Sequence, residues 1–141
     1  MTPLAQAGFH HAQITVEDIE RSRQFYAGFV GLKELPRPVG FAFPGAWFAL
    51  ANGQELHIVK VPDPLWKRSN KLEIYETHMA LRVPSFRAAL AHLEAHGYSE
   101  SLPDGDALKM VVKLNSPTGY PQVYILDPDG HLIEFNAANY D

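Results

Sequence analysis

Four side chains of kinds that bind metal ions occur in this chain of 141 residues at places that match in pairs: His11, His57, His78 and Glu134. Imidazole nitrogen and carboxylate oxygen together suit a divalent ion of Zn, Ni, Co, Mn or Fe. Cysteine is absent, which excludes thiolate ligands, disulfides and a cysteine nucleophile. These residues predict a metal site if the fold brings them together.

The matching depends first on where two helices are predicted to begin. His11 lies seven residues before Asp18, and His78 lies seven residues before Ser85. Aspartate and serine are favoured N-cap residues, so both histidines are predicted on a strand at the same distance from a following helix. A single histidine on a strand is more often structural than a ligand, but two at one register favour a ligand role.

The other pair is placed by glycines in two predicted turns. His57 lies four residues after Gly53, and Glu134 lies four residues after Gly130. Glu134 stands in an apolar run, where a carboxylate needs water, a cation or a metal as partner. Glu55 shares the predicted strand face of His57, so it is an alternative ligand at that position.

Hydrophobic periodicity and turn residues predict the same order of elements twice. In the first half we expect a strand at 9–16 and then a helix that starts after Asp18 and ends at Gly31. Three strands follow at 32–36, 46–50 and 54–61. In the second half we expect strands at 77–83 and near 98–102, a helix between Ser85 and Gly97, and a hairpin at 122–135. The stretch 104–121 gives mixed signals, although its segment MVVKL is compatible with a strand.

Domain boundaries follow from this repeat. We predict one domain over 1–141, made of a first βαβββ module at 9–61, a linker at 62–75 and a second βαβββ module at 76–137. The linker is polar and contains two prolines near its start.

Charge and composition restrict the classes of partner. The net charge is −4 and no run of Lys and Arg occurs, so a nucleic-acid-binding surface is not expected. The most apolar stretch, 39–51, is interrupted by Pro44 and Gly45 and is too short to span a bilayer. No signal peptide pattern is found at the start of the sequence, and we expect a cytoplasmic protein.

Several segments in this order resemble the vicinal oxygen chelate superfamily, which includes glyoxalase I, extradiol dioxygenases, fosfomycin resistance proteins and bleomycin-binding proteins. The resemblance is carried by HAQITVEDIERSRQFYAGFVGL at 11–32, WFALANGQELHIV at 47–59, THMALRV at 77–83 and ILDPDGHLIEF at 125–135.

The resemblance implies an α+β fold in which two βαβββ modules form a curved mixed sheet around a cleft, with helices outside. It also implies that a divalent metal ion is held by His11, His57, His78 and Glu134, in one chain or across a homodimer. The expected function is a metal-dependent lyase or isomerase of the glyoxalase type, acting on a small substrate that chelates the ion through vicinal oxygens. Glu134 is the expected catalytic residue, as a ligand that could also move a proton.

The glyoxalase pattern differs from this chain at two positions. Glyoxalase I proteins commonly have a carboxylate in place of His57 and an arginine in place of Thr15, where it holds the glutathione carboxylate. Arg82 stands at the symmetric position in the second module. The missing arginine makes a glutathione adduct a less favoured substrate, for which Arg82 would compensate only in part. The expected pocket residues are Gln13, Thr15, Arg82 and Tyr124.

Two alternatives are open. His11, His78 and Glu134 match the two-His, one-carboxylate triad of an extradiol dioxygenase. The histidine that this signature expects before the hairpin is replaced by Asn115, Ser116 and Pro117. The other alternative is a bleomycin-resistance-like protein that binds a small molecule without a metal, and such members commonly lack the ligand set.

Overall fold

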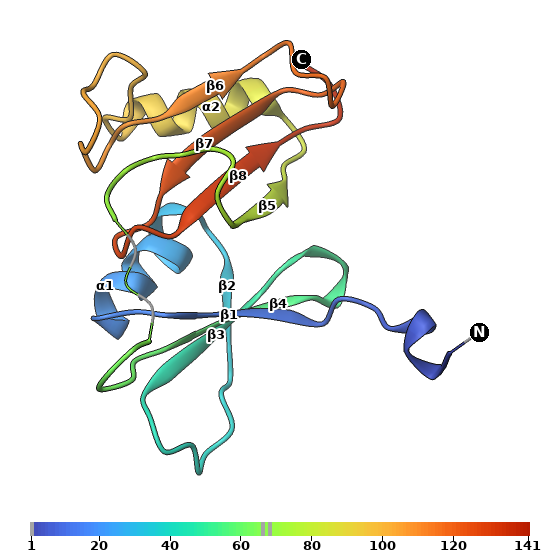
Figure 1. Ribbon diagram of the computed structural model, residues 1–141, viewed down its shortest axis with the longest axis vertical. Helices are drawn as coiled ribbons and strands as arrows, with labels where there is room; N and C mark the ends of the chain where they lie inside the picture. The colour runs from blue at the N-terminus through green and yellow to red at the C-terminus, as the bar shows by residue number, and fades with distance from the viewer. Residues whose placement is uncertain (1, 66, 68) are drawn as a thin grey trace. The chain divides into compact units, whose positions relative to one another are not determined.

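The chain forms two compact units, Met1–Trp66 and Lys67–Asp141, and each contains one four-stranded mixed sheet (Figure 1). The structure is a computed structural model that describes residues 2–65, 67 and 69–141. Each unit has the order strand, helix and three strands, which confirms the predicted fold class of two βαβββ modules.

The first unit begins with a short 3-10 helix, η1 (Pro3–Gln6), and its sheet has the strand order β1-β4-β3-β2. β1 and β4 are parallel, and the other neighbours are antiparallel. The elements after η1 are β1 (His11–Thr15), α1 (Ile19–Arg23), η2 (Gln24–Phe29), β2 (Lys33–Leu35), β3 (Gly45–Ala49), η3 (Ala51–Gly53) and β4 (Glu55–Val59).

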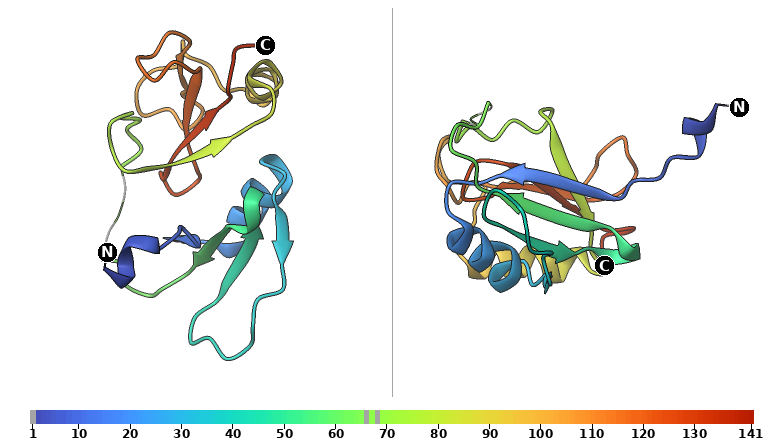
Figure 2. Two further views of the ribbon diagram at one scale, coloured as in Figure 1. Left: turned by 90° about the vertical axis from the view of Figure 1, so that its right-hand side faces the viewer. Right: turned by 90° about the horizontal axis from the view of Figure 1, so that it is seen from below.

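The second unit repeats this topology with the strand order β5-β8-β7-β6. β5 and β8 are parallel, and the other neighbours are antiparallel. Its elements are β5 (His78–Arg82), α2 (Phe86–Ala95), β6 (Val111–Lys113), β7 (Gln122–Leu126) and β8 (Leu132–Asn136). Figure 2 shows β7 and β8 beside each other, with α2 on one side of their sheet.

The first helix begins where predicted but changes its winding. The Asp18 side chain accepts a hydrogen bond from Arg21 N at 3.0 Å, as an N-cap does. After Arg23 the helix widens into the π-helical turn η2, in which Val30 N donates to Phe25 O at 2.8 Å. Gly31 then has φ 85°, which confirms the predicted glycine stop.

The prediction of a strand near 98–102 is wrong. Ser99 makes only an isolated bridge with Lys109, and its hydroxyl accepts a hydrogen bond from Ser101 N at 3.1 Å. Such local side-chain bonds favour a turn over an extended strand. The additional strand of the second sheet is β6, which contains the VVK of the segment MVVKL and pairs with β7.

Each sheet has one apolar face that is covered by the helix of its own unit. In the first unit Tyr26 packs against Phe48 with ring centroids 5.9 Å apart, and both side chains are fully buried. In the second unit α2 contacts β8, and Phe86, Ile125 and Ile133 are fully buried. Burial of these aromatic and aliphatic side chains provides the main stabilisation of each unit and leaves the opposite face for polar residues.

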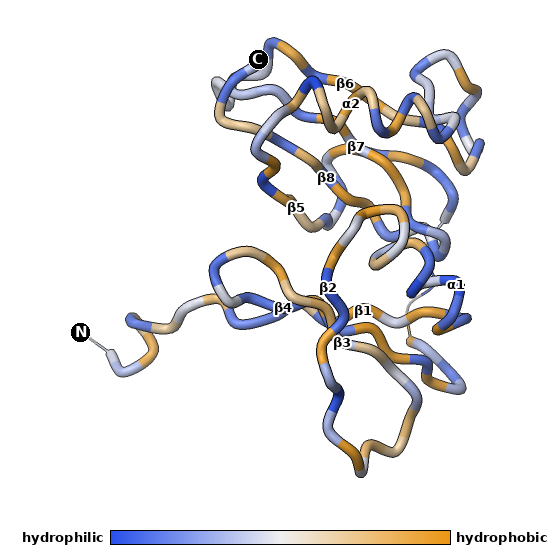
Figure 3. The backbone as a smooth tube through the Cα atoms, turned by 180° about the vertical axis from the view of Figure 1, so that it is seen from behind, coloured by the Kyte–Doolittle hydropathy of each residue, from blue (hydrophilic) through white to orange (hydrophobic). Residues whose placement is uncertain are grey.

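The connections differ in how far they join these cores: Leu72 and Ile74, between β4 and β5, pack against Tyr124, Leu126 and Leu132. The loop between β2 and β3 contains the exposed side chains of Val39, Phe41 and Phe43, and Figure 3 shows hydrophobic residues in it. No strand or helix lies between β4 and β5 among the described residues, and Trp66 and Arg68 of the predicted linker are outside that description. No described helix is long and apolar enough to cross a membrane.

Candidate metal-binding site

The ladder registers place His57 and Glu134 at equivalent positions in their two sheets. In the first unit His11 pairs with Glu55, and His57 is two residues further along β4. In the second unit His78 pairs with Leu132, and Glu134 is two residues further along β8. Because side chains alternate along a strand, each unit places one histidine of β1 or β5 on the same face as the second candidate ligand.

The pair in the second unit is in direct contact. His78 Nε2 lies 3.1 Å from Glu134 Oε2, and His78 Nδ1 lies 2.7 Å from the backbone oxygen of Glu76. A carbonyl oxygen can only accept, so Nδ1 carries the proton. Nε2 of a neutral ring would then direct its lone pair at the carboxylate, and a cation must lie between these two atoms, either a proton on Nε2 or a metal ion.

Glu134 is only 3% exposed and is held by polar neighbours. Its Oε1 accepts hydrogen bonds from Asn136 Nδ2 at 2.7 Å and from Gln122 Nε2 at 3.0 Å. Desolvation raises the pKa of the Glu134 carboxyl, but hydrogen bonds from Asn136, Gln122 and Tyr124 and the charge of His78 together lower it below its usual value. The group is therefore a buried anion at neutral pH.

Tyr124 faces Glu134 from the neighbouring strand β7, where the two residues pair in the ladder. Its hydroxyl is hydrogen-bonded to the Glu134 carboxylate, and its ring meets the His78 ring edge-on with centroids 5.6 Å apart. Burial, followed by the charge and hydrogen bond of Glu134, raises the pKa of Tyr124 to about 12. The hydroxyl thus remains a hydrogen-bond donor at any ordinary pH.

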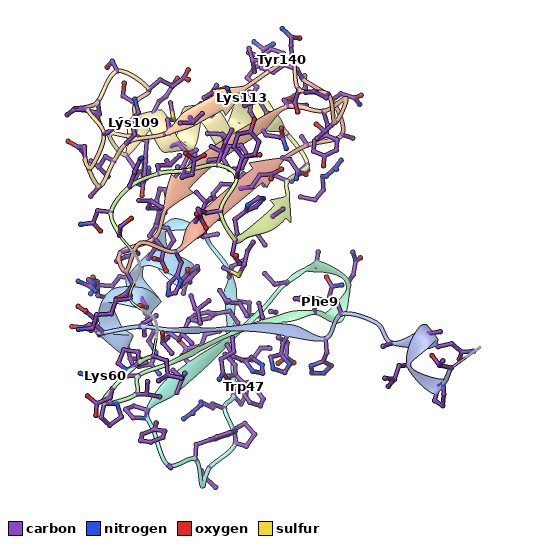
Figure 4. All side chains as sticks on the ribbon, in the orientation of Figure 1. Phe9, Trp47, Lys60, Lys109, Lys113 and Tyr140 are labelled. Carbon is purple, nitrogen blue, oxygen red and sulfur yellow. The ribbon has the colours of Figure 1, made fainter. Side chains whose placement is uncertain are left out.

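In the first unit His57 lies between two other rings. Its imidazole stacks on the indole of Trp47 at 4.1 Å between centroids and on the His11 imidazole at 4.2 Å. Figure 4 labels Trp47 on β3. His57 Nε2 also lies 2.6 Å from Glu55 Oε2, so Glu55 and His57 form one hydrogen-bonded pair. His57 is 5% exposed, which leaves its ring well enclosed.

His11 also contacts the residue before it. His10 Nδ1 and His11 Nδ1 are 2.8 Å apart, so one of these nitrogens donates and the other accepts. His10 lies just before β1. His11 Nε2 is the nitrogen directed away from this contact, and it is the one that suits a ligand role.

The donor set fits a divalent ion best at His78 and Glu134. Two ligand atoms about 2.1 Å from an octahedral ion and at right angles around it lie about 3.0 Å apart, close to the separation of His78 Nε2 and Glu134 Oε2, whereas tetrahedral ligands would lie about 3.4 Å apart. His57 fits less well, since its Nε2 is engaged by Glu55 and the lone pairs of stacked rings do not converge. No group of three or more His, Asp or Glu side chains is arranged so that it could hold a metal ion in the part of the chain that the structure describes.

The predicted pocket residues lie on the same sheet faces as these pairs. Gln13 pairs with His57 in the ladder, and Thr15 pairs with Val59 at the end of β1. Arg82 pairs with Asn136, and its guanidinium lies 4.9 Å from the centroid of the Tyr120 ring. The Arg82 guanidinium is thus two ladder positions along from the pair that Ala80 forms with Glu134.

Two residues that touch the candidate ligand were not predicted from the sequence. Gln122 and Asn136 are opposite each other on β7 and β8, two pairs along from Tyr124 and Glu134. Counting residues outward from the turn at 127–130 would have placed these four side chains on one face of the predicted hairpin. Their amides were missed because an amide near a carboxylate gives no motif of its own.

Comparisons with known proteins identify the family of this chain. A family model described as the Glyoxalase/Bleomycin resistance protein/Dioxygenase superfamily matches residues 8–135. A protein named Glyoxylase I 4 from Arabidopsis thaliana is 23% identical over 135 residues, which cover 94% of this chain and 71% of that protein.

Solved structures share the fold. A glyoxalase family protein from Bacillus anthracis superposes with a TM-score of 0.72 at 23% identity, and 93% of this chain and 94% of that chain are covered. The fosfomycin resistance protein FosX from Listeria monocytogenes superposes with a TM-score of 0.65 at 20% identity, with 93% of each chain covered. At these identities the likeness concerns the fold alone.

Proposed function

Because this chain belongs to the Glyoxalase/Bleomycin resistance protein/Dioxygenase superfamily, we propose that it is a metal-dependent lyase or isomerase of the glyoxalase type. Its substrate would be a small oxygenated molecule that chelates the ion through two neighbouring oxygens. The ligands implied by the family resemblance are His11, His78 and Glu134, with the Glu55–His57 pair at the fourth position, in one chain or across a homodimer.

The contact between His78 and Glu134 is the observation that supports this proposal most strongly. The Glu76 carbonyl fixes the proton on His78 Nδ1, and the Glu134 carboxylate is an anion with a lowered pKa. Two such atoms 3.1 Å apart require a proton or a metal ion between them. A divalent ion satisfies both atoms, and the backbone hydrogen bond orients the imidazole for it.

The fourth position is assigned to a pair because its two members are bonded to each other. With Glu55 Oε2 bound to His57 Nε2, the other carboxylate oxygen of Glu55 is the donor that the pair can offer to an ion. His57 then holds the carboxylate, and Trp47 and His11 hold His57 by stacking. His57 as the direct ligand requires this contact to open.

The chemistry follows from the donor set. A bound divalent ion would act as a Lewis acid on the two substrate oxygens and stabilise the negative charge that develops beside a carbonyl. Glu134 is the catalytic residue, because its Oε2, when it leaves the ion transiently, could accept the substrate proton and return it to the neighbouring carbon. Tyr124 donates to the carboxylate throughout, and Arg82 is available for an anionic group of the substrate.

A ring-cleaving dioxygenase is the second candidate, favoured by the two histidines and one carboxylate His11, His78 and Glu134. Three measurements on the purified protein distinguish the candidates. Elemental analysis identifies the bound metal, and two activity assays follow oxygen uptake with catechols and isomerisation of α-hydroxycarbonyl compounds. Stoichiometric Ni or Zn with isomerisation supports the lyase. Fe(II) with oxygen uptake supports the dioxygenase, and the absence of a stoichiometric divalent metal supports a binding protein without a metal.

We also propose that the protein is a cytoplasmic homodimer. The dimer is expected from the family resemblance, and the cellular location from the sequence pattern alone. Light scattering coupled to gel filtration measures the first, and cell fractionation measures the second.

A further inference from the structure

The two oxygens of the Glu134 carboxylate have partners of different kinds. Oε1 accepts hydrogen bonds from two amide groups, Asn136 Nδ2 at 2.7 Å and Gln122 Nε2 at 3.0 Å. Oε2 faces the His78 imidazole at 3.1 Å. The carboxylate therefore has one oxygen that is held by the protein and one that faces the candidate ligand.

The orientation of the Asn136 amide shows which interaction determines it. Its Nδ2 donates to Glu134, whereas its Oδ1 is buried with no hydrogen-bond partner among the described residues. Turning the amide over would bring two acceptor oxygens together, which is unfavourable. Asn136 thus donates from Nδ2 to Oε1 of Glu134, although this orientation leaves its own Oδ1 buried and unpaired, which is costly.

The strand ladder explains why both amides reach the same oxygen. Gln122 on β7 pairs with Asn136 on β8, two positions from the pair formed by Tyr124 and Glu134, and β7 and β8 lie side by side in Figure 1. All four side chains project from one face of the sheet. Gln122 is 6% exposed and Asn136 is 5% exposed, so water competes little for these bonds.

We propose that Gln122 and Asn136 are positioning residues that occupy Oε1 of Glu134, so that Glu134 offers a single oxygen, Oε2, to a metal ion and to the transferred proton. This inference rests on the proposed function. A carboxylate that binds through both oxygens fills two coordination positions, whereas one that binds through Oε2 fills one. The amides would thus keep a position open for the second oxygen of a chelating substrate.

Infrared difference spectroscopy on metal loading tests this directly, with Mn²⁺ as the probe. Binding through one oxygen widens the separation between the two carboxylate stretching bands, and binding through both oxygens narrows it. The Glu134 bands are identified as those lost in Glu134→Gln. We expect a widened separation in the wild type and a narrowed one in the double variant Gln122→Met/Asn136→Leu, which retains approximate side-chain volume but loses both donors.

Metal affinity gives a second measurement on the same variants. Loss of the partners that orient a ligand typically weakens metal binding by about 10-fold to 100-fold, and we expect this loss in the double variant. Asn139→Leu, which removes an exposed amide outside β8, is the matched control and should keep the wild-type affinity and bands. Gln122→Met alone should give an intermediate effect if the double variant does not fold.

The outcomes separate this inference from the proposed function. A wild type that binds Mn²⁺ with a narrowed band separation overturns the inference and leaves the proposed function standing. The same is true if the double variant binds with wild-type affinity and band separation. A wild type that binds no divalent ion overturns the proposed function, and the inference is overturned with it.

Discussion

His57 and Glu134 occupy the same place in the ladders of their two sheets, but their neighbours give them different roles. The residue next to Glu134 in the parallel ladder is Ala80, and the residue next to His57 is Gln13. Glu134 contacts the histidine of its own unit through Oε2, whereas His57 stacks on His11 and turns its Nε2 to Glu55. The repeat thus places candidate ligands at equivalent points without making them chemically equivalent.

Replacement of His78 by alanine should remove most of the metal binding. The variant loses the Nε2 ligand, and Oε2 of Glu134 loses its neighbour. We expect the affinity for a divalent metal to fall by about 100-fold or more, because loss of a ligand should cost more than loss of a residue that only orients one. Isothermal titration calorimetry with Zn²⁺ measures the change. His92→Ala, a histidine of α2, is the matched control, and equal affinities in all three proteins would contradict the assignment.

The two members of the Glu55–His57 pair should act as a unit. Their atoms are 2.6 Å apart, so Glu55→Gln and His57→Gln should each weaken metal binding, and the double variant should be little weaker than the poorer single variant. A double-mutant cycle of metal affinities provides the coupling energy. Losses that add fully would mean that the two side chains bind the ion independently.

The sequence predicted the placement of the candidate ligands better than their contacts. Helix N-caps at Asp18 and Ser85 are local signals, as is the turn that ends at Gly130, so the two βαβββ modules and the matched registers could be predicted. The stacking of Trp47, His57 and His11 depends on cross-strand neighbours and ring orientation, which residue spacing does not define.

The missed features of the fold have a similar cause. The π-helical turn at Gln24–Phe29 depends on how Phe25 and Tyr26 pack against the sheet, and residue periodicity does not distinguish it from a regular helix. β6, for which the segment MVVKL was compatible with a strand, is only three residues long and is stabilised by pairing with β7, so the sequence alone did not predict it firmly.

Acid should weaken the metal-free protein through Glu134. The pKa of this carboxyl is lowered from 4.5 in the folded state, so the unfolded chain takes up its proton at higher pH. The stabilisation is present above 4.5 and is lost as the pH falls through the lower folded pKa. Urea unfolding at several pH values should show that the wild type loses stability relative to Glu134→Gln as the pH falls below 4.5. If the wild type instead became more stable relative to Glu134→Gln in acid, the lowered pKa of Glu134 would be contradicted.

Removal of the Tyr124 hydroxyl should destabilise the fold. Tyr124→Phe deletes the hydrogen bond to the buried Glu134 anion and leaves the packing of the ring unchanged, at a cost of about 1.5–3 kcal/mol in the free energy of unfolding. Tyr75→Phe is a matched control, because Tyr75 is exposed. Urea unfolding curves that coincide for wild type and Tyr124→Phe would show that this hydrogen bond contributes nothing.

Alanine at position 130 should strain the turn that precedes Glu134. Gly130 has φ 84°, where a Cβ atom costs about 1–2 kcal/mol. Gly28→Ala is the control, since it lies in η2 with no atom within 4 Å of an added Cβ and should be neutral or stabilising by about 0.5–1 kcal/mol. Thermal unfolding measures both, and similar effects at the two positions would exclude a special role for the turn.

The most direct test is the crystal structure of the protein loaded with Zn²⁺, with anomalous scattering recorded at the zinc edge. The account predicts an anomalous peak about 2.0–2.2 Å from both His78 Nε2 and Glu134 Oε2, with Oε1 still bound to Asn136 and Gln122. A loaded crystal with no peak between His78 and Glu134, or with the ion bound elsewhere, would contradict it.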